Sequence, residues 1–226
     1  MAFRDYYETR IEKAQSGLER AQRRRSLYPH GTKRGLDIAL VLVTLPISLP
    51  LILIMMCLVS LDGRSPIYLQ KRLGRNGRVF RMVKIRTMVP RADALLEDYL
   101  RENPAARHEW NESQKLKCDP RITATGSFLR KSSLDELPQL WNVLIGDMSL
   151  VGPRPMMVDQ ESLYPGTAYF ELRPGITGPW QVSERNESSF ADRAGFDRRY
   201  LASMSLAQDL TILMRTVAVV IRGTGY

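Results

Sequence analysis

The feature that most constrains this chain is an apolar run from Ile38 to Leu61, which contains no charged residue. A helix needs about 20 apolar residues to cross a bilayer, so the run is long enough to do so. Pro46 and Pro50 fall in its middle, however, and each removes a backbone hydrogen bond and kinks a helix. The run therefore indicates a membrane element, either one bent transmembrane helix or a helix-break-helix.

The charges on either side of the run favour the second form. Arginines and lysines flank both ends: Arg4, Arg10, Lys13, Arg20, Arg23, Arg24, Arg25, Lys33 and Arg34 before it, and Arg64, Lys71, Arg72, Arg75, Arg78, Arg81, Lys84, Arg86 and Arg91 after it. Cytoplasmic flanks carry the positive excess, so a segment that enters and leaves on the cytoplasmic face resolves the conflict. Each half then spans roughly 18 Å, too short to cross the bilayer alone. Between the prolines, Ser48 can bond a backbone group that they free.

The remaining chain predicts a mixture of helices and strands. Residues 66–70 and 78–86 read as strands joined by a turn at 74–77, and residues 92–101 as an amphipathic helix. Residues 128–129 and 137–144 supply core positions. Residues 210–222 are too short and too charged to span, so they form a buried helix or, as we expect, one in the membrane interface. We expect an α+β protein with a basic arm at 1–32, a re-entrant helix at 33–61 and a cytoplasmic domain at 62–226.

The formal net charge of +9 points to an anionic partner. Nucleic acid, an anionic lipid surface and a phosphorylated substrate all qualify. The sequence shows no helix-turn-helix, zinc or RNA-binding signature, and its basic residues gather beside the apolar run, so we predict no nucleic-acid binding. Cys57 and Cys118 are far apart in unlike surroundings, which predicts reduced thiols.

The most informative polar motif is the adjacent pair Asp135-Glu136. Neighbouring carboxylates raise each other's pKa unless a metal or a positive dipole offsets them. Because Pro138 lacks an N–H, it fits only the first turn of a helix, which predicts a helix that begins near Asp135. That helix would aim its free N–H groups at the carboxylates and at a phosphate beside them. The alternative is a structural capping box that begins at Ser133.

Basic residues suited to phosphate are spread along the cytoplasmic part. The candidates are Lys84, Arg86, Arg121, Arg130 and Arg154. Arginine binds phosphate oxygens through two parallel hydrogen bonds, although each of these side chains could instead be a solvated surface charge. Pro153 and Pro155 fix the backbone on both sides of Arg154. Gly175 and Gly178 could form a turn that approaches phosphate, a weak signal by itself.

Several ordered blocks resemble the bacterial sugar transferases, small monotopic polyprenol-phosphate phosphoglycosyl transferases. Beside the motif from Ser132 to Pro155, these blocks are residues 33–37, 70–77, 84–88, 119–123 and 173–178. The chain departs from the family pattern at Ser48-Leu49-Pro50, where a Ser-Pro pair is expected, and at Gly178-Pro179-Trp180-Gln181. In length and ending it is most similar to the members that initiate exopolysaccharide synthesis with galactose 1-phosphate.

The resemblance implies that a UDP-hexose and polyprenyl phosphate yield polyprenyl-diphospho-hexose and UMP, with galactose as the first expectation and glucose the second. In such a transfer we expect Asp135 to be the nucleophile and Glu136 to hold Mg²⁺. Pro50 and Pro138 would shape the membrane break and the site.

We also expect the catalytic domain to lie on the cytoplasmic face of the inner membrane, against an anionic lipid surface. Downstream glycosyltransferases are the expected partners, and a homodimer is left open. The alternative is a membrane-anchored interaction protein without catalytic activity, in which Asp135-Glu136 only caps a helix.

Overall fold

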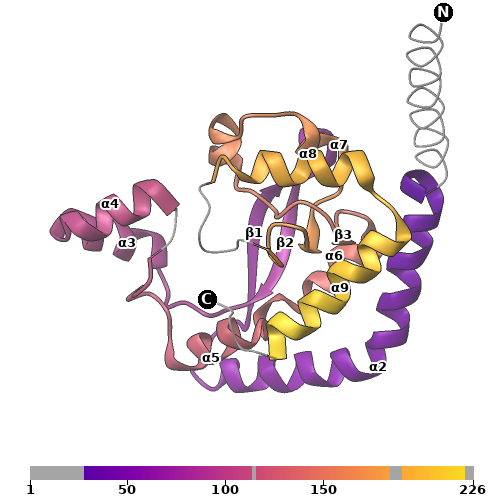
Figure 1. Ribbon diagram of the computed structural model, residues 1–226. Helices are drawn as coiled ribbons and strands as arrows, with labels where there is room; N and C mark the ends of the chain where they lie inside the picture. Colours follow the sequence, from indigo (N-terminus) through magenta and orange to yellow (C-terminus); the bar gives the residue numbers. More distant parts are fainter. Residues whose placement is uncertain (1–27, 114–115, 184–189, 222–226) are drawn as a thin grey trace, which may run out of the picture.

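The computed structural model describes residues 28–113, 116–183 and 190–221 (Figure 1). The basic arm expected at 1–32 therefore lies outside the described residues up to position 27. The helices are α2 Lys33–Ser60, α3 Ala92–Glu102, α4 Pro104–Ser113, α5 Ala124–Ser132, α6 Gln139–Ile145, α7 Ala168–Glu171, α8 Arg193–Ser203 and α9 Leu206–Ile221. The strands are β1 Ile67–Leu73, β2 Val79–Ile85, β3 Ser149–Val151 and β4 Gly175–Thr177. Short turns are η1 Tyr28–Thr32, η2 Arg75–Gly77, η3 Leu134–Glu136 and η4 Val158–Leu163.

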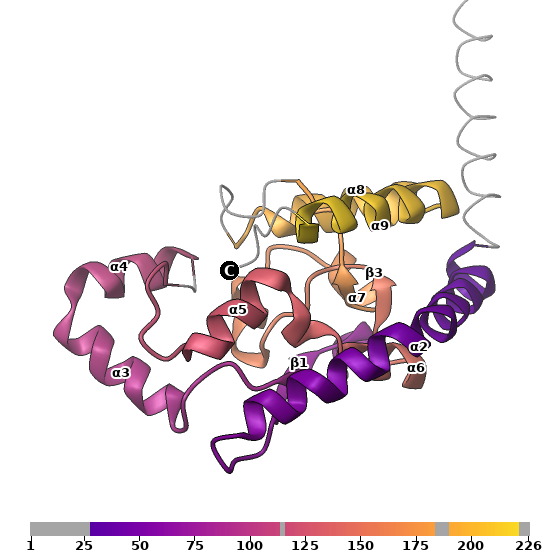
Figure 2. The same cartoon turned by 90° about the horizontal axis from the view of Figure 1, so that it is seen from below.

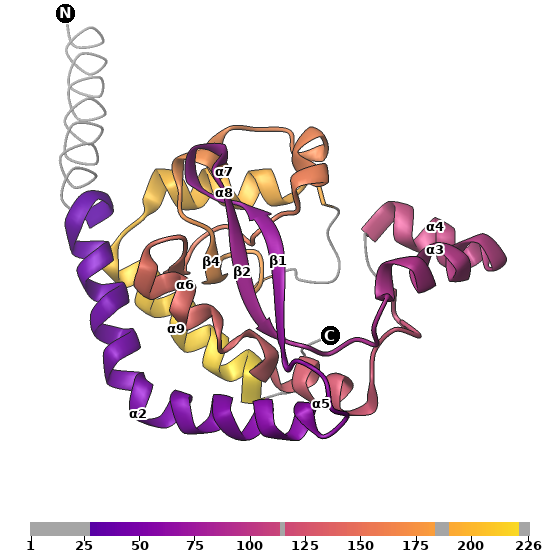
Figure 3. The same ribbon diagram turned by 180° about the vertical axis from the view of Figure 1, so that it is seen from behind.

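The apolar run forms one 28-residue helix, α2, with Pro46 and Pro50 inside it. Figures 1 and 3 show that this helix bends sharply near its middle into two limbs. The expected interruption is thus a bend within a continuous helix, because prolines remove single hydrogen bonds and leave the rest of the ladder in place. The expectation for Ser48 is wrong, since its buried hydroxyl has no hydrogen-bond partner.

Most of the apolar surface of α2 is exposed. Large side chains such as Val43 and Ile47 are 74% and 78% exposed, whereas Val41 and Met55 pack inward. Among the described residues, α2 is the one helix that is long and apolar enough to cross a membrane. A core helix of a soluble protein would be mostly buried, so the exposure indicates an apolar environment around α2.

The polar start of α2 is tied to the rest of the molecule. Arg34 donates to the carbonyls of Val143 and Leu144 at the end of α6. Asp37 accepts hydrogen bonds from the Ser149 hydroxyl at 2.8 Å and from the Leu150 amide at 3.1 Å. These bonds use the side chains of the motif at residues 33–37, so that motif fixes the first limb of α2 to α6 and β3.

A second contact joins α2 to the C-terminal helices. The buried carboxylate of Asp209 in α9 accepts hydrogen bonds from Tyr28 at 2.8 Å, from Tyr200 in α8 at 2.6 Å and from Lys33. A buried charge is tolerated only when it is paired and hydrogen-bonded, and here three donors meet that requirement. The helix at the C-terminus is thereby held beside α2.

The predicted hairpin is confirmed, with a first strand longer and a second strand slightly shorter than expected. β1 and β2 pair antiparallel from Ile67↔Ile85 to Leu73↔Val79, with the turn at Gly74–Gly77 where Asn76 and Gly77 have positive φ. The hairpin runs from the end of α2 to α7 and α8 (Figure 3). The small parallel sheet of β3 and β4 lies beside it.

The glycines near β4 have a structural explanation. A Cβ on Gly175 would lie 2.2 Å from the amide nitrogen of Gly152, and one on Gly178 would lie 2.0 Å from the Gly152 carbonyl oxygen. Only glycine permits these backbones to approach so closely. The pattern that suggested a phosphate-approaching turn is explained by packing of the β3–β4 pair.

Helices α3 and α4 follow the hairpin in the chain. The predicted helix at 92–101 is confirmed as α3, and α4 follows it in a stretch that carried no clear pattern (Figure 2).

In α9 one face is buried at Asp209 and Ile212, whereas Leu210, Met214 and Val217 are exposed. That exposed apolar face is what an interfacial helix requires.

Candidate active site

The acidic pair lies in a tight turn rather than at the start of a long helix. Helix α5 ends at Ser133, which has a positive φ of 56°, and Leu134–Glu136 form the 3₁₀ turn η3 before α6. Helix α6 begins at Gln139 with Pro138 as its N-cap residue, so the expected helix start near Asp135 is wrong by four positions. The capping box is wrong as well, because the Ser133 side chain makes no capping bond.

Asp135 is almost fully buried, with 5% of its surface exposed. The ammonium group of Lys84 lies 3.5 Å from its Oδ2 atom and 2.9 Å from Oε1 of Glu136. Burial raises the pKa of Asp135 above its usual value; Lys84 and Arg130 oppose the rise, and Glu136 adds to it. The structure thus brings together four of the residues singled out in the sequence: the carboxylates of Asp135 and Glu136 and the cations of Lys84 and Arg130.

Asn142 positions Lys84, and sequence reasoning missed it. Its side-chain oxygen accepts from the Val83 amide at 2.9 Å, and its amide nitrogen donates to the Arg81 carbonyl at 2.8 Å. The side chain is 1% exposed. It therefore joins α6 to β2 directly beside Lys84 and sets the distance between that lysine and the acidic turn. A polar residue within an apolar helical run was the signal that could have revealed it.

Arg130 reaches the site from α5. Its Nε atom donates to the Thr87 hydroxyl at 2.9 Å, and burial lowers its pKa while Asp135 and Asp119 act in the opposite direction. The N-terminus of α5 is capped by Thr123, which accepts from the Gly126 amide at 2.9 Å. Thr123 also bonds the Thr87 carbonyl at 3.4 Å. These contacts fix α5 against the segment after β2.

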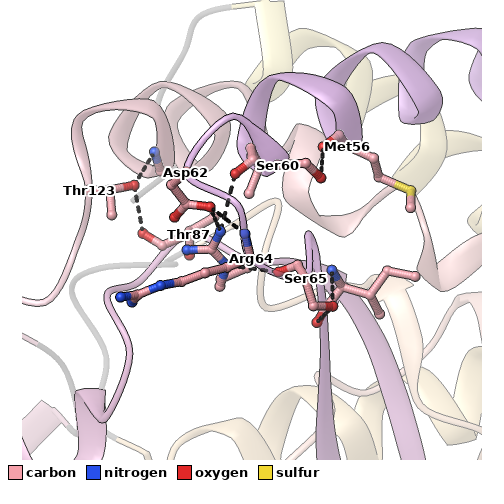
Figure 4. Close-up of polar contacts among 11 residues, drawn as sticks. Met56, Ser60, Asp62, Arg64, Ser65, Thr87 and Thr123 are labelled. Carbon is pink, nitrogen blue, oxygen red and sulfur yellow. Dashed lines mark hydrogen bonds and ion pairs between the residues drawn. The ribbon is translucent and has the colours of Figure 1, made fainter.

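Arg86 has a structural role at the end of α2. Its guanidinium donates to Asp62 at 2.7 Å, to the Val59 carbonyl at 3.1 Å and to the Ser65 carbonyl at 2.9 Å. Figure 4 shows this joint, where Ser60, Asp62 and Arg64 lie close to Ser65 and Thr87. The guanidinium nitrogens that we expected to bind phosphate donate instead to these protein oxygens, so Arg86 is not part of the site around Asp135 and Glu136.

Arg121 is also engaged within the protein. Its guanidinium makes two hydrogen bonds to Asp119, at 2.8 and 2.6 Å, and stacks 5.4 Å from the Trp110 ring centre. The pair is buried, with side chains 7% and 5% exposed. Because the Asp119 carboxylate already accepts hydrogen bonds from two nitrogens of the guanidinium, Arg121 supports the structure next to Arg130 and is not available to bind phosphate.

Arg154 lies in the loop after β3. The carbonyl of Pro153 accepts from the Gly175 amide at 2.8 Å, and that of Pro155 accepts from Arg72 at 3.1 Å. Both flanking residues are thus fixed, as the sequence indicated. The guanidinium of Arg154 lies 5.8 Å from the ring centre of Trp180, a residue that is 3% exposed.

The residues at the site fit one mode of Mg²⁺ binding. No cluster of three or more Asp, Glu, His or Cys side chains occurs among the residues that the structure describes, so a site made by protein alone is not found there. Mg²⁺ commonly binds through one or two carboxylates and substrate phosphates, and Glu136, 20% exposed at its side chain, offers one such carboxylate.

Comparisons with known proteins show the family of the chain. The model of the bacterial sugar transferase family matches residues 28–223. A UDP-galactose-lipid carrier transferase of Erwinia amylovora is 48% identical over 195 residues, which cover 85% of this chain and 41% of that protein. The exopolysaccharide production protein ExoY of Rhizobium meliloti is 46% identical over 196 residues, 85% of this chain and 87% of ExoY.

A third relative is the undecaprenyl-phosphate galactose phosphotransferase of Salmonella typhimurium, 46% identical over 195 residues. Those residues make up 85% of this chain and 41% of the Salmonella protein, so the chain spans less than half of that relative and most of ExoY. The family match extends from η1 through α9 and includes every residue placed at the site above. The chain belongs to the bacterial sugar transferase family.

Proposed function

We propose that this protein transfers hexose 1-phosphate from a UDP-hexose to undecaprenyl or another polyprenyl phosphate and thereby initiates exopolysaccharide assembly. The observation that carries the proposal is the buried carboxylate of Asp135, held between Lys84 and Arg130 and adjacent to Glu136. A phosphoryl transfer needs a positioned nucleophile and charge neutralisation around phosphorus, and this cluster supplies both. The names of the relatives support the same reaction.

In the first step a carboxylate oxygen of Asp135 attacks the phosphorus that bears the sugar. An O–P bond forms, the bond from that phosphorus to the bridging oxygen of the diphosphate breaks, and UMP leaves with the electron pair. In the second step an oxygen of polyprenyl phosphate attacks the same phosphorus. The bond to Asp135 breaks, which restores the carboxylate and yields polyprenyl-diphospho-hexose.

The cations beside Asp135 have distinct roles. Lys84, fixed by the Asn142 bonds to β2, balances the pair of carboxylates and can bind the phosphoryl oxygens as a point charge. Arg130, held by Thr87, offers its remaining donors to the same oxygens. Mg²⁺, held by Glu136 and the diphosphate, would supply further charge neutralisation when it is bound.

The two substrates differ in solubility, which suits a site next to a membrane. We propose that α2 enters and leaves the inner membrane on the cytoplasmic face, and that the exposed face of α9 rests in the interface. The bend at Pro46 and Pro50 and the exposed apolar side chains of α2 support this. Lipid-linked sugar formed there would pass to downstream glycosyltransferases. Galactose is the favoured hexose, since two relatives are named for it, and glucose is the next candidate.

The test is UMP release by the purified full-length protein. UDP-galactose, UDP-glucose and other UDP-sugars are each incubated with polyprenyl phosphate, and UMP and lipid-linked sugar are measured. We expect turnover with at least one donor, loss of turnover in Asp135→Asn, and no loss in Asp159→Asn, a matched change at an exposed aspartate. If no donor yields UMP, or if Asp135→Asn retains full activity in a folded protein, the alternative of a non-catalytic interaction protein is favoured.

A further inference from the structure

Three arginines gather on the side of the acidic pair that faces α8. Arg72 comes from β1, Arg154 from the proline-flanked loop after β3, and Arg193 from the first position of α8. The indole of Trp180 lies within the group: the guanidinium carbon of Arg193 is 4.3 Å from its ring centre and that of Arg154 is 5.8 Å away. Segments far apart in the chain thus place three guanidinium groups around one buried aromatic ring.

The positive charge of this cluster is poorly balanced. Within the described part of the chain, no ion pair joins any of these three arginines to a carboxylate. Burial, together with the charge of Arg154, lowers the pKa of Arg72 to about 10 and that of Arg193 to about 9. Asp197 is the one carboxylate that acts on Arg193, and it accepts a hydrogen bond from Tyr164 at 2.9 Å. A folded protein keeps such mutual repulsion only where something offsets it.

Two of the arginines carry buried donors without an acceptor. The Nε atoms of Arg72 and Arg193 have no hydrogen-bond partner. The other two nitrogens of Arg72 donate to the Pro155 carbonyl at 3.1 Å and to the Gln70 side chain at 2.7 Å, and these bonds hold the partly buried side chain in place. Because a buried donor is costly to leave unpaired, an oxyanion between these side chains would satisfy both the charge and the geometry.

The cluster adjoins the acidic pair and lies toward the turn end of the hairpin, opposite the C-terminal end of α2. The carboxylate of Glu136 acts on Arg72 and favours its charged form. Arg72 lies near the hairpin turn, whereas Arg86, at the opposite end of the hairpin, contacts the end of α2. Figure 3 shows the turn end of the hairpin next to α7 and α8.

We propose that Arg72, Arg154 and Arg193, backed by Trp180, form a second phosphate site that binds the nucleotide phosphate of the donor and holds UMP as it leaves. This inference rests on the proposed function. Lys84 and Arg130 then serve the phosphorus that is attacked, and the arginine cluster takes the charge that develops on the departing phosphate. Guanidinium groups suit this task because each binds two phosphate oxygens in parallel.

The experiment compares Arg193→Gln with Arg199→Gln in the full-length protein. Arg199 is a matched control, since it lies in the same helix and also stacks on an aromatic ring, that of Phe196, at 4.6 Å. We expect Arg193→Gln to raise the KM for the UDP-sugar and the Kd for UMP by about tenfold or more, with the KM for polyprenyl phosphate unchanged. Arg193→Lys should recover part of the loss, and Arg199→Gln should match the wild type.

A rise in the KM for polyprenyl phosphate alone would assign the site to the lipid and overturn the proposal, as would unchanged UMP binding in a folded Arg193→Gln protein. If Arg193→Gln does not fold, Arg154→Gln, which leaves α8 intact, decides the question through the same constants. Direct binding of UMP is measured without turnover. A wild type that binds UMP through these arginines but transfers no sugar would contradict the proposed function while the phosphate site stands.

Discussion

At the scale of single residues, the site places charged side chains closer together than they would lie on a solvated surface. Asp135 is buried beside Glu136, and its ionised form depends on Lys84 and Arg130. The same features favour a nucleophile, because a carboxylate with few water molecules around it and a fixed position loses little freedom on attack. Glu136 is more exposed than Asp135 and closer to Lys84, which suits a ligand for a charged cofactor better than a nucleophile.

The first prediction concerns metal. Because Glu136 supplies the carboxylate for Mg²⁺ in our proposal, excess chelator should abolish UMP release and added Mg²⁺ should restore it. Glu136→Gln should raise the Mg²⁺ concentration needed for half-maximal activity, while Glu161→Gln, a change at an exposed glutamate, should not. Full activity in excess chelator would refute this role.

The second prediction concerns pH and stability at Asp197. Burial raises the pKa of this side chain to about 6, against about 3.9 in an unfolded chain. The folded state therefore binds the proton more tightly, so this stabilising contribution is complete below pH 4 and is lost as pH rises through 6. It amounts to about 3 kcal/mol, or roughly 6–12 °C in Tm.

Asp197→Asn removes that titration. Thermal unfolding measured from pH 4 to pH 7 should show a Tm difference between wild type and variant that shifts in favour of the variant as pH rises. A difference independent of pH would mean that Asp197 does not titrate in this range. Asp159→Asn, at an exposed position, is the control.

At the scale of elements, local patterns predicted what local physics determines. The turn Gly74–Gly77 needs positive φ at Asn76 and Gly77, so its sequence revealed the hairpin. The acidic turn was harder, since Ser133 with positive φ separates α5 from η3 and no glycine marks that position. Prolines were informative both in α2 and at the acidic site, but the sequence alone could not distinguish a bend in a continuous helix from an interruption of the helix.

The partner of Arg86 could not be predicted from local pattern because Asp62 is 24 residues away, whereas Asp119, only two residues from Arg121, is a local partner that the sequence analysis missed. Arg86 and Arg121 carry the same charge as Arg130, yet each forms an ion pair within the protein, Arg86 with Asp62 and Arg121 with Asp119. Conversely, Arg72 and Arg193 gave no local signal and meet only when β1 and α8 are packed together. The acidic pair itself and Lys84 were found because the motif around them resembles a known family.

The third prediction tests how α6 is joined to β2. Asn142→Leu removes both hydrogen bonds to the backbone of β2, which leaves the Val83 amide and the Arg81 carbonyl without this partner. We expect a loss of about 2 kcal/mol in the free energy of unfolding and a fall in kcat, because Lys84 shifts relative to Asp135.

Asn103→Leu is the matched control. Among the contacts that the structure describes for the Asn103 side chain, its amide nitrogen donates only to the Tyr99 carbonyl. Chemical unfolding and steady-state kinetics of both variants provide the measurement. An Asn142→Leu protein with unchanged kcat would show that these bonds do not position Lys84.

At the scale of the whole molecule, two apolar surfaces face outward on the same protein. One is the exposed face of the bent helix α2, and the other is the exposed face of α9 with Leu210, Met214 and Val217. Figure 2 shows α9 beside α8 on one side of the molecule and the second limb of α2 on the opposite side. Such surfaces are stable only against an apolar partner, which the bilayer provides.

The fourth prediction is the topology. Single cysteines at positions 23 and 75, in a protein whose Cys57 and Cys118 are replaced, should both react with a membrane-impermeant thiol reagent only from the cytoplasmic side. A re-entrant α2 keeps both of its ends on one face, and the balanced basic flanks favour this arrangement. Labelling of the two positions from opposite sides would mean that α2 crosses the membrane.

The central claim is that Asp135 forms a covalent bond to the phosphorus of the donor. The full-length protein is incubated with its UDP-sugar in the absence of polyprenyl phosphate, and the reaction is quenched. We predict release of about one UMP per active enzyme and the added mass of a hexose phosphate on the peptide that contains Asp135, both absent from Asp135→Asn. Release of UMP only after polyprenyl phosphate is added, with no adduct on that peptide, would contradict the account and favour direct transfer.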